Sequence, residues 1–148
     1  MEQQYQTASQ FSFVLKLGDD PTEYRFQEVS GLSVEIEIEQ VVEGDDARHV
    51  YQIPKHSNHQ NVTVKRGLAD ASSPLMTWSR DTLQNLANPI KPHAIIVSLQ
   101  DDKGDEVAMW RVKQAWPVKW NLSVQTAAGA ETAIESIEFA HGGIERAL

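Results

Sequence analysis

Apolar and polar residues alternate along most of the chain, a pattern that predicts β-strands. In FSFVLKL (11–17) every second residue is apolar, and the turn residues of GDDP (18–21) separate it from EYRFQEV (23–29), its expected hairpin partner. The further segments of strand character are 33–43, 49–54, 61–67, 93–99, 107–120 and 133–144. We therefore expect about seven or eight strands, mostly antiparallel.

Two polar segments between strands are expected to be loops. The first, GDDAR (44–48), follows the longest acidic strand segment. The second, KHSNHQ (55–60), follows Pro54, which we expect to end its strand because proline cannot donate to the ladder.

One segment changes from a two-residue to a helical period. SSPLMTWSRDTLQNLANP (72–89) offers Ser73 as the N-cap and Pro74 at the first helical position. Apolar side chains then recur at helical spacing until the Asn-Pro pair at 88–89 stops the helix. The sequence predicts a helix over about 73–87. The fold class is therefore mainly β: a small antiparallel barrel or two-sheet sandwich with one flanking α-helix.

The strand 33–43 carries an acidic stripe, defined as Glu35, Glu37 and Glu39. Glutamates two positions apart on a strand lie about 6.5–7 Å apart. Two such charges repel by about 0.6 kcal/mol in water and by about 2.4 kcal/mol at an effective dielectric of 20. The stripe must therefore face water or a basic partner. The aliphatic residues between the glutamates point to the other side, which we expect to face the core: Val34, Ile36 and Ile38.

Three tryptophans share the segment 107–120 at even spacing: Trp110, Trp116 and Trp120. On a regular strand they would face one side, and we interpret them as core residues beneath the helix, near Trp78. The alternative is a flat platform on which a ligand stacks. Pro117 lies within the same segment and indicates an edge position or a bulge there.

Composition and charge fit one acidic domain spanning 1–148, with 1–10 expected to be a flexible N-terminus. The net charge of −8 argues against nonspecific binding to nucleic acid or to an anionic membrane, because both need Lys and Arg. The absence of cysteine excludes disulfides and thiolate metal sites. The polar start MEQQYQTASQ does not resemble a signal peptide, and the longest aliphatic run, AIIV (94–97), is too short for a membrane span. We expect synthesis in the cytoplasm.

Few residues form patterns with catalytic or ligand-binding chemistry. His56 and His59 form H-x-x-H in a Ser- and Asn-containing segment without a neighbouring acid or cysteine, so we expect exposed loop histidines rather than metal ligands. DDKGDE (101–106) lacks the acid pattern of a calcium loop and predicts a hairpin tip with Gly104 in the turn. No nucleophile elbow, phosphate-binding glycine loop or dinucleotide fingerprint occurs. We expect no enzyme, cofactor or metal.

Several motifs occur in a suggestive order: FQEVSGLSVEIEIEQVVEG, NVTVKRG, PLMTWSRDTL, AWPVKW and AIESIEFAHGGI. In this order and spacing they resemble the tail tube proteins of contractile phages and of phage-tail-like contractile injection systems, which are related to the type VI secretion tube protein. The resemblance runs from about Phe11 to Ile144. One departure is IPKHSNHQ (53–60), where many members carry a Pro-Gly pair.

The resemblance implies a protomer of hexameric rings that stack into a hollow tube inside a contractile sheath. It implies as partners other copies of the chain, the sheath protein, baseplate, spike and tube-initiator proteins, and cargo or DNA in the lumen, without direct membrane binding. The place would be a phage-tail or injection-system particle, including released particles. A loop after the long acidic strand would touch the next ring, and we expect its contacts from Gly44, Asp45, Asp46 and Arg48. The acidic stripe would line the lumen or face the sheath, and the alternative is a plain solvated face without a partner.

Two alternatives remain open. The same fold suits a tube initiator or baseplate adaptor. A monomeric β-barrel that binds a ligand on its tryptophan face belongs to a different class, and a persistent monomer in size-exclusion chromatography would favour it. Self-association is favoured by the unpaired N–H and C=O groups that an open antiparallel sheet leaves at its margins, because a neighbour's strand can pair with them.

Overall fold

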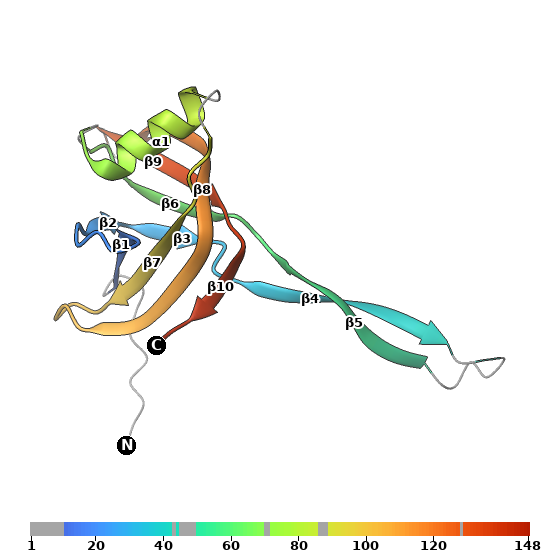
Figure 1. Cartoon of the computed structure of the whole chain (residues 1–148). Helices are drawn as coiled ribbons and strands as arrows, with labels where there is room; N and C mark the ends of the chain where they lie inside the picture. Colours follow the sequence, from blue (N-terminus) through green and yellow to red (C-terminus); the bar gives the residue numbers. More distant parts are fainter. Residues whose placement is uncertain (1–10, 43, 45–49, 70–71, 86–88, 128) are drawn as a thin grey trace, which may run out of the picture.

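A computed structural model describes residues 11–42, 44, 50–69, 72–85, 89–127 and 129–148 (Figure 1). The predicted class, mainly β with one flanking helix, is confirmed in this part of the chain. The helix is α1 (Pro74–Gln84). The strands are β1 (Ser12–Leu17), β2 (Tyr24–Phe26), β3 (Glu28–Ser30), β4 (Val34–Val42), β5 (Val50–His59), β6 (Val62–Gly67), β7 (His93–Gln100), β8 (Glu106–Ala127), β9 (Ala130–Ala140) and β10 (Gly143–Arg146).

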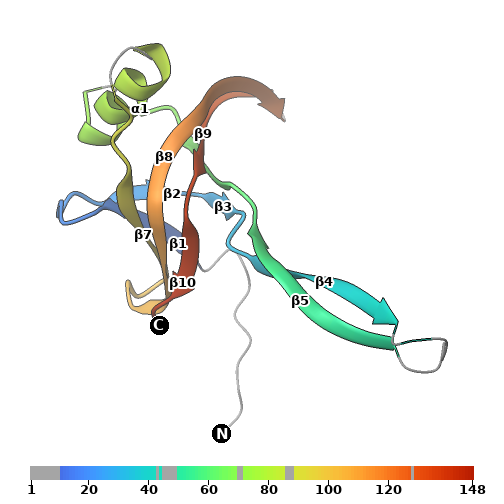
Figure 2. The same ribbon diagram turned by 45° about the vertical axis from the view of Figure 1, so that its right-hand side comes forward.

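Eight strands form one antiparallel sheet in the order β2-β1-β7-β8-β9-β6-β3, with β10 beside β8. Its first and last strands, β2 and β3, are separated only by Gln27, whose N–H donates to the carbonyl of Lys65 over 2.9 Å. The sheet therefore curls until its two ends meet, as in a small barrel. The long strand β8 curves through this barrel, pairing with β7 and β10 along its first half and with β9 along its second (Figure 2).

The core lies inside the barrel, where the alternation along the strands places apolar side chains. Val62 and Val64 of β6 are at most 1% exposed, as the pattern of 61–67 predicts. They pack with buried residues of the other strands, including Leu15, Ile95, Val112, Ile137 and Phe139. Val14 on the other side of β1 is also buried, so that strand is covered on both faces rather than on one.

The helix α1 begins as the sequence predicts. Ser73 is its N-cap, with the side-chain oxygen accepting the N–H of Met76 over 3.3 Å, and Pro74 follows in the first turn. Leu75 is fully buried, and its N–H donates to the hydroxyl of Tyr24 over 3.2 Å, which ties the helix start to β2. The helix ends at Gln84, before the predicted end near 87, and residues 86–88 lie outside the described residues.

The strands β4 and β5 leave the barrel together as a two-stranded antiparallel arm, here called the arm (Figures 1 and 2). The nine residues of β4 correspond to about 30 Å at 3.3–3.4 Å per residue. The prediction of a loop at 55–60 is wrong, because β5 continues past Pro54 to His59. A bulge opposite Glu37 and Ile38 accommodates the extra residue, Lys55, and β5 has a free outer edge where a proline costs no ladder bond.

The arm continues the β3–β6 pair, and Gly31 forms the bend between them. Its φ is +88°, a conformation that L side chains rarely adopt. A Cβ there would lie 2.0 Å from the carbonyl oxygen of Asn61. The two strands therefore change direction at a point where only glycine lets the backbones approach this closely.

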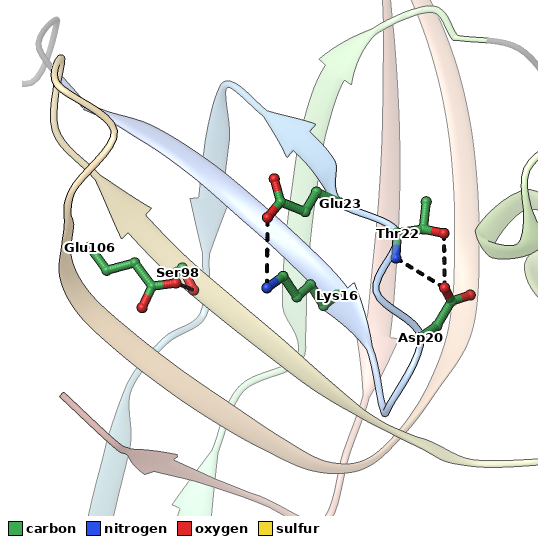
Figure 3. A network of polar contacts seen from close by, with 6 residues as sticks. All are labelled: Lys16, Asp20, Thr22, Glu23, Ser98 and Glu106. Atoms are coloured by element: carbon green, nitrogen blue, oxygen red, sulfur yellow. Dashed lines mark hydrogen bonds and ion pairs between the residues drawn. The ribbon is translucent and has the colours of Figure 1, made fainter.

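Polar contacts fix the hairpin ends of the barrel (Figure 3). The N–H and the hydroxyl of Thr22 donate to Oδ1 of Asp20 over 3.0 and 2.8 Å, and these bonds lower the pKa of the Asp20 carboxyl. Lys16 lies 3.7 Å from Glu23 across the β1–β2 hairpin. At the β7–β8 hairpin, Asp101 accepts the N–H groups of residues 103 and 105, and Gly104 has a φ of +85°. The predicted hairpin tip at 101–106 is confirmed.

Candidate functional site

One face of the arm carries a row of exposed aliphatic side chains. We define its aliphatic stripe as Val34, Ile36, Ile38, Val42 and Val50; Val42 and Val50 are directly opposed across the arm. These side chains are 47–58% exposed. The prediction that Val34, Ile36 and Ile38 face the core is therefore wrong in this chain, because β4 pairs only with β5 and lies outside the barrel sheet.

The opposite face carries the acidic stripe on the half of the arm near the barrel. Glu35, Glu37 and Glu39 are exposed, as their mutual repulsion requires. Oε2 of Glu37 lies 2.8 Å from Nε2 of His56, and it accepts a 3.4 Å hydrogen bond from Asn58. His56 is thus a strand residue with a carboxylate partner on the other strand, which its sequence neighbours could not indicate.

An arm with this composition is typical of a surface that another protein covers. A two-stranded ribbon is at best marginally stable alone in water, and no strand of the described residues pairs with either outer edge of this one. Covering a half-exposed Val or Ile contributes about 1 kcal/mol, half the value for a fully buried side chain. The aliphatic stripe therefore offers several kcal/mol to a complementary partner.

The predicted contact loop falls almost wholly outside the described residues. Gly44 lies in an exposed turn with a φ of +60°, which suits a hairpin tip. Asp45, Asp46 and Arg48 lie outside the described part of the chain. Their expected role in contacts stays a prediction.

The four tryptophans differ in their surroundings. Trp78 and Trp110 are partly buried against the core, and Trp78 stacks on Phe139 with ring centroids 5.9 Å apart. Trp116 is half-buried. Trp120 is 43% exposed and lies beside a groove between α1 and β8, so its assignment to the core is wrong for this chain.

An irregularity in β8 explains why even spacing did not place Trp116 on the face of Trp110. Gln114 has a φ of +50°, and the buried positions change there from Ala108 and Val112 to Ala115 and Pro117. A second register shift lies between Pro117 and Lys119, which confirms the predicted bulge at Pro117. Alternation holds only between such irregularities.

A buried ion pair between β6 and β9 was missed by the sequence analysis. Nε of Arg66 lies 3.5 Å from Oε2 of Glu135, with the two side chains 10% and 2% exposed. The indole N–H of Trp120 donates to Oε1 of Glu135 over 2.8 Å, and the guanidinium of Arg66 lies 5.0 Å from the ring centre of Phe26. The sequence does contain a signal for the burial of Arg66. This residue follows Val62 and Val64 at even spacing, so it lies on the same face of the strand as these two valines.

A polar groove runs over the outer face of β3, β6, β8 and β9. Its lining side chains include two acids, two lysines and several hydroxyl and amide groups: Glu28, Thr63, Lys65, Lys119, Asn121, Ser123, Ser136 and Glu138. Within the described residues, no group of three His, Asp or Glu is placed to hold a metal ion. Across the same residues, no helix has both the length and the apolarity that a bilayer crossing requires.

The barrel with its flanking helix and projecting arm defines a structural subunit of the tail-tube type. The chain belongs to the family of the T4-like virus tail tube protein gp19, whose family model matches residues 9–145. Its role is that of a tube-type structural protein. Among proteins of curated function, none matches the chain significantly.

Solved structures share this fold. A chain in the cryo-EM structure of the anti-feeding prophage baseplate is similar with a TM-score of 0.77 and 21% identity, over 99% of this chain and 97% of that one. A chain of the PVC extracellular contractile injection system, from its extended sheath–tube complex, gives 0.72 and 22% over 90% and 86%. Hcp1 from Salmonella typhimurium gives 0.55 and 12% over 92% and 85%.

Proposed function

We propose that this chain is the repeating subunit of a hollow tube inside a contractile particle, assembled from stacked hexameric rings. The observation that carries the proposal is the exposed aliphatic stripe on a long arm, in a chain of the tail tube family. In this role the protein is a conduit and a spear, and it performs no catalysis. Its partners are copies of itself, the sheath protein and the baseplate, and it works in a phage-tail-like particle.

The arm is the element that joins subunits in this proposal. Its aliphatic stripe packs against a neighbouring copy, and its free edges lie where a neighbour's strands can pair with them. A head-to-tail contact of this kind closes into a ring when the rotation is right, and the arm tip, including Gly44, reaches the next ring. Within the described residues, the arm thus has free edges of the kind that the sequence analysis expected on the sheet, whereas β2 and β3 are joined through Gln27.

A tube initiator or baseplate adaptor is the second candidate. It is favoured by the likeness to a chain from a baseplate structure, which covers 99% of this protein. The two roles differ in copy number, because a tube subunit is needed in every ring and an initiator in one or two. If the chain is the main tube subunit, we therefore expect many more copies of it per particle than an initiator would have.

The first prediction concerns assembly of the purified chain. At micromolar concentration and neutral pH, we expect rings and tubes in negative-stain electron microscopy, because the aliphatic stripe drives association. In purified particles the chain is expected at about the same copy number as the sheath protein. A chain that stays monomeric at all concentrations would contradict the tube role and favour the ligand-binding barrel. One or two rings per particle would instead identify an initiator.

The second prediction concerns the acidic stripe. When the aliphatic stripe is covered by a neighbour, the three glutamates form the exposed outer face of that contact. Changing Glu35, Glu37 and Glu39 together to lysine is expected to leave tube assembly intact. Loss of sheath binding in co-sedimentation then assigns the stripe to the sheath side, and altered ejection with the sheath still bound assigns it to the lumen. Unchanged binding and ejection would contradict both roles.

A further inference from the structure

Two histidines meet where the arm joins the barrel. His59 ends β5, and its ring stacks on that of His141 with centroids 4.1 Å apart and an interplanar angle of 27°. His141 lies between β9 and β10. Its Nε2 lies 2.7 Å from the carbonyl oxygen of Gln60, and its Nδ1 accepts the N–H of Gly143 over 3.1 Å. One imidazole thus links the root of the arm to a corner of the barrel.

These two contacts fix the protonation state of His141. A carbonyl oxygen can only accept, so Nε2 carries a hydrogen, and a backbone N–H can only donate, so Nδ1 carries none. The ring is therefore neutral in the Nε2–H tautomer. A second proton would sit on Nδ1 and face the Gly143 N–H, so this hydrogen bond would be lost.

The surroundings oppose charge on this ring. Partial burial lowers the pKa of His141 most, and the charge of His59 lowers it further, against the raising effects of the backbone contacts with Gln60 and Gly143. Of the other charged groups nearby, Glu138 on β9 accepts a hydrogen bond from Asn61 over 3.1 Å. Lys113 on β8 directs its ammonium group to Glu145 at 3.2 Å.

The sign of the pH effect follows from the lowered pKa. The unfolded or detached imidazole binds a proton near pH 6.5, whereas the docked ring binds it only at lower pH. The neutral contact therefore contributes its full stability above pH 6.5, and this contribution is lost as the pH falls below that value.

We propose that His59 and His141 form a pH-sensitive clasp, which holds the arm root against the β9–β10 corner while the ring of His141 is neutral and releases it when this ring is protonated. The consequence for assembly rests on the proposed tube function: release of the arm root in mild acid weakens the contacts between subunits.

The clasp is tested on the full chain by histidine ¹⁵N NMR and by amide exchange. His141 is expected as the Nε2–H tautomer at pH 8, with a titration midpoint below that of a free histidine. Protection of the Gly143 amide, corrected for the intrinsic exchange rate, is expected to fall as the pH is lowered. The fall is about tenfold per pH unit in the interval between the pKa of the detached imidazole and the lower pKa of the docked ring. His59→Phe keeps an aromatic stack without the second charge, so the His141 midpoint should rise and the loss of protection should shrink.

His56→Gln is the matched control, because it removes an arm histidine that contacts Glu37 rather than the clasp. It should leave the His141 midpoint and Gly143 protection unchanged. An Nδ1–H tautomer, a normal midpoint, or the same pH response in His59→Phe as in the native chain would overturn the clasp.

The link to assembly is tested separately by sedimentation of tubes at pH 7.5 and pH 5.5. Native tubes are expected to dissociate at the lower pH, and His59→Phe tubes to persist to lower pH. If no tubes form at either pH, the proposed function fails while the NMR result still decides the clasp. If native tubes persist at pH 5.5 although the clasp has titrated, control of assembly by the clasp is overturned.

Discussion

Replacing Ile36 and Ile38 together with aspartate is expected to abolish tube assembly while the barrel stays folded. Both side chains are more than half exposed in the single chain, at 58% and 53%, and both lie on the arm rather than in the barrel sheet. Surface substitutions of this kind change the free energy of unfolding by about 0.5 kcal/mol or less. The melting temperature and circular dichroism spectrum should therefore remain close to those of the native chain.

The effect on assembly is expected to be far larger, because a neighbouring subunit covers the same positions in the proposed tube. An unpaired carboxylate placed in an apolar contact costs several kcal/mol, and the apolar contact itself is lost. A total of about 4 kcal/mol corresponds to a thousandfold weaker association. Sedimentation of tubes over a concentration series measures this change as a rise in the critical concentration.

The matched control is Ile36→Val with Ile38→Val, which keeps β-branched apolar side chains at both positions. It should assemble at a concentration within about fifteenfold of the native chain, since each of the two removed methylenes is worth about 0.8 kcal/mol. Normal tubes from the double aspartate variant would show that the aliphatic stripe lies outside the subunit contacts.

The sequence predicted those elements whose local signals agree with their surroundings. Ser73 and Pro74 mark the start of α1 because a cap and a proline act through local hydrogen bonds and backbone geometry. The β7–β8 hairpin follows equally from Gly104 between two alternating segments. These signals need no knowledge of the tertiary fold.

The arm was mispredicted because, in the described residues, its two strands pair with each other outside the barrel sheet. Alternation in 33–43 correctly indicated a strand with an acidic and an aliphatic face, yet it could not show that the aliphatic face lies outside the core. The segment 55–60 has the composition of a loop, and a strand exposed on both faces leaves no alternation by which to recognise it.

Contacts between distant strands were equally beyond the sequence. His59 and His141 come together only through the pairing of β6 with β9, and His56 meets Glu37 only through that of β4 with β5. The tryptophan assignment failed for other reasons. The irregularity at Gln114 reverses the alternation before Trp116, and the one at Pro117 restores it. Trp120 therefore lies on the side of its partner Ile137, but at a point of β8 where it is 43% exposed. Register and bulges depend on the partner strand as well as on the segment itself.

Glu135→Ala is expected to lower the free energy of unfolding by about 3–5 kcal/mol, the typical cost of removing one partner from a buried ion pair. The substitution leaves the guanidinium of Arg66 in a site where its side chain is only 10% exposed. Its contact with the ring of Phe26 remains, but an exposed cation–π contact is worth only about 0.5–1 kcal/mol and a desolvated one about 2 kcal/mol. Urea denaturation followed by tryptophan fluorescence measures the loss.

The matched control is Glu28→Ala, which removes an acid from the exposed pair with Lys65. That pair spans 3.8 Å between side chains 47% and 63% exposed, so the expected change is about 0.2–1 kcal/mol. Glu28 and Glu135 form ion pairs with two adjacent residues of β6, Lys65 and Arg66. The two pairs differ mainly in burial. An equal loss in both variants would show that burial does not set the cost.

The double variant Arg66→Leu with Glu135→Leu separates two contributions to the free energy of unfolding: the penalty of burying one unpaired charge, and the net stabilisation from the ion pair. Replacing both ions by apolar groups removes two desolvation penalties along with their attraction, so most of the loss in Glu135→Ala should be recovered. The indole N–H of Trp120 loses its acceptor in both variants, but this residue is 43% exposed and water can accept the bond. A double variant as unstable as the single one would mean that the pair itself stabilises the barrel. Recovery would instead point to a role for the pair in fixing the register of β6 against β9.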